Sequence, residues 1–355
     1  MPTLFDPLQI GPLTLRNRIV MAPLTRARAG ADRIPNAMMA EYYAQRAGAG
    51  LILSEATSVT PMGVGYADTP GIWNDAQVEG WKLVTKAVHD AGGLIFLQLW
   101  HVGRISDPQF LDGQAPVAPS AIQPAGTVSL VRPKKEYVTP RALDTDEIPG
   151  IVEAYRKGAE NAKRAGFDGV EIHGANGYLI DQFLQDRSNT RTDQYGGDIQ
   201  NRVRFLNEIT DAVVGVWGGD RVGVHLAPRG DSHDMGDSDA RALFTQVARD
   251  MRARGVAFLC LRERVAEDSL LDAIRDAFGG PVIANEGLTR ESAEALLAEG
   301  RADAVAFGRD FIATPDLPER FRRGLPLNDQ DPATFYAGGA EGYTDYPTAT
   351  DIAAE

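Results

Sequence analysis

Apolar residues recur along the chain in eight short runs, separated by longer segments of mixed character. The runs are nearly continuous in apolar character rather than alternating, as expected of parallel β-strands that are covered on both faces. They are Arg18–Leu24, Leu51–Thr57, Gly93–Trp100, Asp168–His173, Arg221–Ala227, Ala257–Arg262, Pro281–Asn285 and Asp303–Gly308. The pattern therefore predicts eight buried parallel strands.

Most of the intervening segments place apolar residues at helical spacing, as Val78, Trp81, Val84 and Val88 do. Helices are predicted over Asp75–Asp90, Asp146–Ala165, Asn201–Val216, Asp239–Arg254, Asp268–Phe278 and Arg290–Glu299. Capping residues precede some of them, namely Asn74 or Asp75 and Thr289, and glycine follows several: Gly92, Gly166, Gly255 and Gly300.

A strand–helix unit repeated eight times favours the α/β class and a closed (β/α)8 barrel. The alternative is an open, doubly wound sheet, which usually carries a glycine-rich turn after its first strand. The residues at that place are Ala22-Pro23-Leu24-Thr25, which is not such a turn. Since no linker marks a second domain, residues 1–355 are expected to form one barrel domain.

Three further segments fall outside the repeat. Leu8–Leu15, around Gly11-Pro12, is predicted to form a hairpin that closes the barrel floor. Val102–Ala142 is a long insertion after the third strand, and loops of that length tend to be functional or mobile. The aromatic-rich tail after Pro326 is expected to pack back on the barrel.

Charge and cysteine usage narrow the possible partners. The net charge of −13 argues against nucleic acid, whose phosphates require clustered Lys and Arg, and the basic run Arg132–Lys135 is expected to be a solvated loop. The single cysteine, Cys260, permits no intrachain disulfide or iron–sulfur cluster, and no metal site is predicted. Without a signal-like N-terminus or a long apolar stretch, we expect a cytoplasmic protein with no membrane partner, as a monomer or homodimer.

In a (β/α)8 barrel the functional site lies at the C-terminal ends of the strands. The residues there are mostly polar, uncharged to basic, with aromatic neighbours and one carboxylate, Glu55. No cluster has metal-ligand spacing, no serine elbow is present, and no strand ends in a lysine suited to a Schiff base. The set suits an organic cofactor that brings its own chemistry.

Long, ordered segments over nearly the whole chain resemble the old yellow enzyme family. The matching segments are Leu4–Pro7, Asn17–Arg26, Gln98–Arg104, Phe167–His173, Ala175–Phe183, Tyr195–Gly197, Phe307–Arg309 and Gly342–Pro347. The resemblance implies FMN as cofactor, a nicotinamide as hydride donor, and an electrophilic alkene as the small-molecule substrate. We expect NADPH as the donor in preference to NADH, although no motif in the sequence decides between the two.

The resemblance assigns catalytic roles to three residues after the fourth strand. His173 and Asn176 hold the carbonyl or nitro oxygen of the substrate, where two hydrogen-bond donors stabilise developing charge. Tyr178 gives a proton to the α-carbon as general acid. Without the resemblance, His173 could equally be a buried histidine of the core, and Tyr178 an aromatic residue that only packs.

Further residues are implied at the cofactor. Thr25 would donate to the flavin O4 edge, Gln98 would contact the pyrimidine edge, and Arg309 would bind the phosphate; Arg309 pairing with Asp310 is the alternative. The remaining implied cofactor contacts are Pro23, Leu24, Ala56, Asn285, Gly287 and Gly308, and the implied walls of the substrate pocket are Tyr66, Trp100 and Tyr336.

One position departs from the family pattern. Where the fifth strand usually carries an arginine beside the N1–O2 edge of the flavin, this chain has His225. An imidazole can donate a hydrogen bond but carries positive charge only when protonated. The departure puts the flavin potential and the tightness of FMN binding in question, while His225 remains an expected cofactor contact.

The reaction implied is a ping-pong reduction. Hydride passes from NAD(P)H through flavin N5 to the β-carbon of an α,β-unsaturated ketone, aldehyde, imide or nitroalkene, and Tyr178 protonates the α-carbon. The alternatives are a related flavin barrel that reduces nitro compounds or nitrate esters, a cofactor-free barrel lyase, and a flavin protein without turnover. A relative of dienoyl-CoA reductases or amine dehydrogenases would need more cysteines than Cys260.

Overall fold

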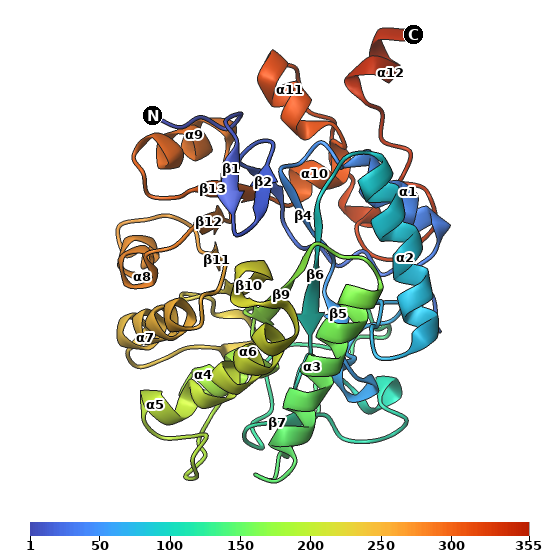
Figure 1. The fold of residues 1–355 in the computed structure, drawn as a ribbon. Helices are drawn as coiled ribbons and strands as arrows, with labels where there is room; N and C mark the ends of the chain where they lie inside the picture. Colours follow the sequence, from blue (N-terminus) through green and yellow to red (C-terminus); the bar gives the residue numbers. More distant parts are fainter. Residues whose placement is uncertain (355) are drawn as a thin grey trace.

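The computed structural model describes residues 1–354, and in it the eight predicted runs form a closed parallel barrel (Figure 1). The strand order is β4-β3-β13-β12-β11-β10-β9-β6, and pairing of β4 with β6 closes the ring. The strands are β3 (Ile19–Met21), β4 (Leu51–Leu53), β6 (Ile95–Trp100), β9 (Gly169–Gly174), β10 (Val222–Leu226), β11 (Phe258–Arg262), β12 (Val282–Asn285) and β13 (Ala304–Phe307). The barrel prediction is confirmed, and the open sheet is excluded.

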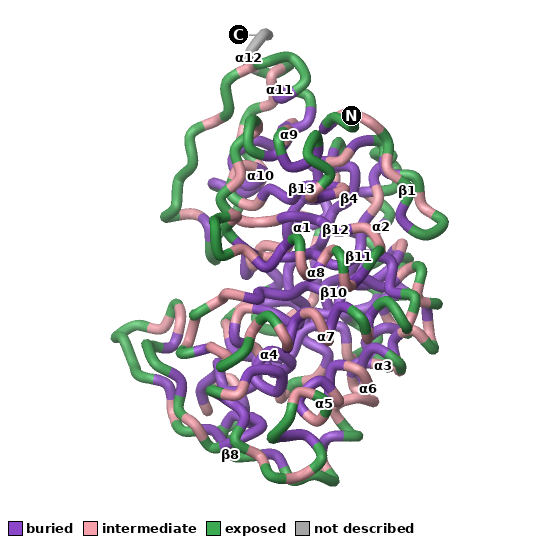
Figure 2. Tube along the Cα trace, turned by 90° about the vertical axis from the view of Figure 1, so that its left-hand side faces the viewer, coloured by how far each residue is buried: buried purple, intermediate pink, exposed green. Residues whose placement is uncertain are grey.

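The strands are apolar throughout because both of their faces are covered. Side chains such as Phe96, Phe258 and Ile283 fill the barrel interior, whereas alternate residues pack outward against the helices. In Figure 2 the barrel strands accordingly lie in a buried centre, and exposed segments are concentrated at the periphery. The predicted hairpin is also present, as β1 (Leu8–Ile10) paired antiparallel with β2 (Leu13–Leu15), and its Ile10 and Leu15 pack on the interior cluster.

Helices surround the barrel (Figure 1). Those predicted correspond to α2 (Asp75–Asp90), α3 (Ile148–Arg164), α5 (Ile199–Arg202) with α6 (Arg204–Trp217), α7 (Ala240–Ala253), α8 (Leu271–Phe278) and α9 (Arg290–Ala298). Asn74 caps α2 and Thr289 caps α9 through capping boxes, which explains where these helices begin. The predicted helix Asn201–Val216 differs, because it is divided at Val203.

Five helices were not predicted from the sequence: α1 (Ala37–Gln45), α4 (Leu179–Leu184), α10 (Arg309–Ala313), α11 (Leu317–Arg323) and α12 (Ala349–Ala354). All have nine residues or fewer, so they show too few turns for a clear periodicity. The predicted strand Leu51–Thr57 is also interrupted, since a separate short strand, β5 (Thr57–Ser58), pairs with β6. Among residues 1–354, no helix has the length and apolar character needed to cross a membrane.

The long insertion and the tail both fold against the barrel. The insertion contains a small parallel pair, β7 (Val117–Ala118) with β8 (Arg141–Ala142), and its Val128 and Tyr137 are buried in a cluster with Trp100. In the tail, the Tyr343 ring is fully buried and stacks on Tyr42 at 4.1 Å between centroids. The two segments thereby form part of the wall at the C-terminal end of the barrel.

Candidate functional site

A cavity of about 920 Å³ opens at the C-terminal ends of the barrel strands. It is lined by all sixteen residues that were proposed for the site: Pro23, Leu24, Thr25, Ala56, Tyr66, Gln98, Trp100, His173, Asn176, Tyr178, His225, Asn285, Gly287, Gly308, Arg309 and Tyr336. Tyr336 stands at the rim, 50% exposed. Glu55, the one carboxylate noted at a strand end, does not line the cavity, because it accepts hydrogen bonds from the backbone of Arg26 and Ala27 behind the wall.

Strand β9 and the tight turn that follows it present the three proposed catalytic residues to the cavity: His173 lies on the strand, Asn176 in the turn, and Tyr178 just after it. Asn176 has φ +61° and Gly177 has φ +77°, so the chain reverses within two left-handed residues. The backbone N–H of Gly177 donates to Asp181 Oδ2 at 2.8 Å, and Gln185 Nε2 donates to Asp181 Oδ1 at 2.6 Å. Burial raises the pKa of Asp181 to about 7. This buried carboxyl group fixes the turn that carries Asn176.

His173 is buried and neutral. Burial, followed by the neighbouring His225 and Arg262, lowers the pKa of His173 well below its ordinary value. The imidazole stacks on Trp100 at 6.4 Å between centroids, and its Nδ1 is buried without a hydrogen-bond partner among the described residues. One ring nitrogen of a neutral imidazole is a donor, so His173 can donate to a bound group without carrying charge.

Tyr178 lies in an aromatic corner of the cavity. Its hydroxyl is 2.8 Å from the hydroxyl of Tyr66, and its ring meets Trp100 edge-on at 5.0 Å between centroids. Burial raises the pKa of both tyrosines well above the ordinary value, so both hydroxyls remain protonated. A protonated phenol with a second phenol behind it can give up a proton while remaining hydrogen-bonded.

The cavity floor carries a hydrogen-bonded group that spans three strands. Gln98 Nε2 donates to Glu171 Oε2 at 2.7 Å and lies 3.3 Å from His225 Nδ1. Since a carboxylate only accepts, the amide nitrogen must face Glu171, which leaves Gln98 Oε1 as a free acceptor. If Nδ1 accepts from Gln98, His225 carries its proton on Nε2, which is buried and has no partner among residues 1–354.

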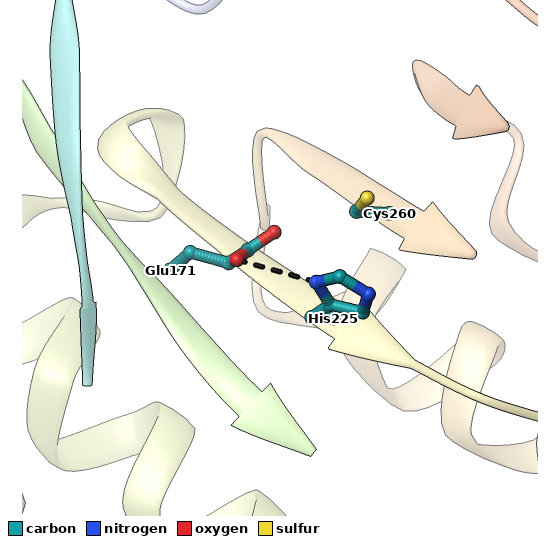
Figure 3. A group of neighbouring side chains, drawn as sticks. All are labelled: Glu171, His225 and Cys260. Atoms are coloured by element: carbon teal, nitrogen blue, oxygen red, sulfur yellow. Dashed lines mark ion pairs between the residues drawn. The ribbon is translucent and has the colours of Figure 1, made fainter. Parts of the chain in front are cut away.

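Figure 3 shows Glu171 directed at His225, with Cys260 on the next strand; the ligand atoms of the three lie within 4.8 Å of one another. Sequence spacing missed this group because strand register, not sequence, places His225 beside Cys260. Burial, and then the charge of Glu171, raises the pKa of the Cys260 thiol well above its usual value. Without a bound ion the thiol is therefore protonated, and Cys260 packs among the apolar side chains of the barrel interior.

The residues of the cavity fit FMN. Gln98 Oε1 offers an acceptor to the polar edge of a ring, and His225 Nε2 offers a donor when Nδ1 accepts from Gln98. Leu24 and Ala56 offer apolar contact. Arg309 forms no ion pair with Asp310, whose carboxylate instead accepts from Gln330 at 2.9 Å. The guanidinium is therefore available to a phosphate.

Several lining residues were not singled out from the sequence. Arg132 and Lys134 belong to the run expected to be a solvated loop; they are exposed, but they also line the cavity. Arg262 ends the sixth strand, so the rule that sites lie at strand ends could have found it. The other such lining residues include Thr127–Leu130, Arg264, Glu286 and Gln330. Nothing in the local sequence marks the insertion residues as part of the wall.

Comparison with known proteins agrees with this geometry. Residues 3–328 match the model of the NADH:flavin oxidoreductase / NADH oxidase family. The chain is 44% identical to 12-oxophytodienoate reductase 1 of Oryza sativa subsp. japonica, over 98% of this chain and 94% of that protein. It is 42% identical to a probable flavin mononucleotide-dependent alkene reductase of Leishmania infantum, over 97% of each.

Solved structures show the same relationship. The structure of morphinone reductase in complex with tetrahydroNAD superposes with a TM-score of 0.95 at 50% identity, covering 98% of each chain. The old yellow enzyme homologue from Zymomonas mobilis gives 0.95 at 48% identity, covering 98% of this chain and 99% of that one. The chain therefore belongs to the NADH:flavin oxidoreductase, or old yellow enzyme, family and is a flavin-dependent NAD(P)H oxidoreductase.

Proposed function

We propose that this chain is an FMN-dependent ene-reductase, formed by one domain over residues 1–355, that reduces the activated C=C bond of α,β-unsaturated ketones, aldehydes, imides or nitroalkenes. The observation that carries the proposal is the grouping of His173, Asn176 and Tyr178 on one wall of the cavity. The relatives named above as an alkene reductase and as reductases of oxophytodienoate and morphinone support it.

When bound, FMN supplies hydride acceptance and hydride donation. The protein residues then have three tasks. His173 and Asn176 hold the substrate oxygen and stabilise the negative charge that grows there as the β-carbon is reduced. Tyr178 holds a proton on its hydroxyl for the α-carbon, and the Tyr66 hydroxyl, 2.8 Å away, donates a hydrogen bond to the phenolate that remains after the transfer. Trp100, which is fully buried, helps to exclude water from this corner.

We further propose NADPH in preference to NADH. Four cations that line the cavity, Arg132, Lys134, Arg264 and Arg309, are in no ion pair within residues 1–354, although acidic residues outnumber basic ones, 49 to 36. Unpaired cations in an acidic protein suit an anionic ligand. One of them is assigned to the FMN phosphate, and the others suit the additional phosphate of NADPH.

Product analysis tests the proposed reaction. The FMN-loaded protein is incubated with NADPH and 2-cyclohexen-1-one, and the products are separated by gas chromatography. The proposal predicts cyclohexanone, the product of C=C reduction. Formation of 2-cyclohexen-1-ol, or oxidation of NADPH without any product, contradicts it. With a nitroalkene the expected product is the nitroalkane, whereas nitrite or an amine would indicate nitro-group chemistry instead.

A further inference from the structure

Arg262 lies on the cavity wall with its guanidinium between two acceptors. It is the last residue of β11, and its Nη1 donates to Oδ1 of Asn176 at 2.6 Å. Its Nη2 lies 3.1 Å from Oε1 of Glu286, in the loop after β12. The Arg262 side chain is 37% exposed and lines the cavity. It thus connects the turn after β9 with the loop after β12.

The contact with Arg262 decides which end of the Asn176 amide faces the cavity. A guanidinium has donors only, so the amide atom 2.6 Å from it must be the carbonyl oxygen. The two hydrogens on Nδ2 are then left without an acceptor among residues 1–354. Because Asn176 also lines the cavity, its amide is set to act there as a donor.

A reversed amide would have the opposite effect. It would present an oxygen to the substrate oxygen and would oppose the negative charge that develops there. Reversal would also bring the Nδ2 hydrogens of Asn176 against the Arg262 cation. The nearby carboxylate of Glu263 does not compete for Arg262, because it accepts from Ser269 Oγ at 2.9 Å and from the Leu270 N–H at 2.8 Å.

We propose that Arg262 is a positioning residue that locks Asn176 as a hydrogen-bond donor toward an anionic or partly anionic substrate oxygen, and that Glu286 holds Arg262 in place. The inference rests on the proposed function, because it takes His173 and Asn176 as the pair that binds this oxygen. Glu286 has φ +104°, which is unusual for a residue with a Cβ atom. Backbone strain of this kind occurs preferentially at functional sites.

The inference predicts a selective loss when Arg262 is replaced. The variant Arg262→Met keeps the length and apolar stem of the side chain but removes its donors. A charge-assisted hydrogen bond contributes a factor of about ten to a hundred. Affinity for a phenolate, and kcat/KM for 2-cyclohexen-1-one, should both fall by that factor. Arg262→Lys, which keeps the charge and a single donor group in place of the guanidinium fork, should restore part of each loss.

The probe is 4-hydroxybenzaldehyde, titrated into the oxidised, FMN-loaded protein over a range of pH and followed by the long-wavelength absorbance of the phenolate–flavin complex. In the wild-type protein the bound phenol should ionise at a lower pH than the free compound does. In Arg262→Met it should ionise at a pH one to two units higher than in the wild type, because each unit corresponds to a tenfold loss of phenolate affinity. A merely structural defect would weaken phenol and phenolate binding alike and would leave this pH unchanged.

The matched control is Arg290→Met on α9. Arg290 also pairs with a glutamate, Glu294, at 2.9 Å and with similar exposure, but outside the cavity. Arg290→Met should bind and ionise the phenol as wild type does. If Arg262→Met behaves like Arg290→Met, the inference is wrong.

Glu286→Gln provides a second variant if Arg262→Met does not fold. This variant weakens the ion pair that holds Arg262 and should lower phenolate affinity in the same way as Arg262→Met, but by a smaller factor. An unchanged phenolate affinity would contradict the inference. Failure of the proposed function is recognised separately, because the FMN-loaded wild type would then neither bind the phenolate nor reduce the enone.

Discussion

Replacing Tyr178 by phenylalanine removes one hydroxyl and leaves the aromatic corner in place. We expect a loss of rate confined to the half-reaction that consumes the alkene. A positioned general acid contributes about 10²–10⁴ in rate, which corresponds to roughly 3–5 kcal/mol of barrier. We expect a loss near the lower end, about 10²-fold, because the Tyr66 hydroxyl lies 2.8 Å from the one removed and can partly replace it.

Stopped-flow absorbance separates the two half-reactions. Reduction of the FMN-loaded Tyr178→Phe protein by NADPH should remain within about twofold of wild type, since that step needs no protein proton. Reoxidation by 2-cyclohexen-1-one should slow by the factor given above. Tyr66→Phe is the control, because it removes the neighbouring hydroxyl but keeps the proposed acid, and it should slow reoxidation less than tenfold. Reoxidation of Tyr178→Phe at the wild-type rate would refute the assignment of Tyr178.

Three further changes test other parts of the site. His225→Arg should raise the flavin reduction potential, on the order of tens of millivolts, in a dye-equilibration titration; an unchanged or lower potential would contradict the cofactor contact at His225. Arg309→Met should raise the FMN dissociation constant by about 10–100-fold, measured by fluorescence, whereas unaltered affinity would exclude the phosphate role. Burial raises the pKa of Glu55 from 4.5 to about 7, so the folded state binds the extra proton and the free energy of unfolding should fall as the pH rises between these values. The contribution of Glu55 to this fall is about 3 kcal/mol. In urea titrations at pH 5 and pH 8 the fall should therefore be smaller by about this amount in Glu55→Gln, while the share that Asp181 contributes, with its pKa also raised to about 7, remains; an identical fall in both proteins would contradict the role of Glu55.

Much of the barrel could be predicted because its physical signals are local. A parallel strand covered on both faces is apolar without interruption, and every barrel strand from β3 to β13 coincides with such a run. Helices such as α2 show several turns of apolar spacing and a capping residue. Short helices give no such signal, and α1 was missed although Asn36 caps it.

Part of the site could be predicted from two sources: the rule that barrel sites lie at the C-terminal ends of the strands, and the family resemblance. Together they indicated that His173, Asn176 and Tyr178 lie in one site. Contacts between strands could not be predicted, because they depend on register and side-chain direction. The group of Gln98, Glu171 and His225 arises from residues on three adjacent strands. The contact from Arg262 to Asn176 likewise joins two strand ends that are 86 residues apart in the sequence.

Flavin content, hydride donor and alkene reduction are tested together by the visible spectrum of the purified protein without air, recorded alone, after NADPH and then after 2-cyclohexen-1-one. The expected result is a yellow protein that bleaches with NADPH and regains its colour with the enone. A colourless protein that takes up no FMN would contradict the cofactor, and a yellow protein that bleaches but stays bleached with the enone would contradict the alkene as substrate.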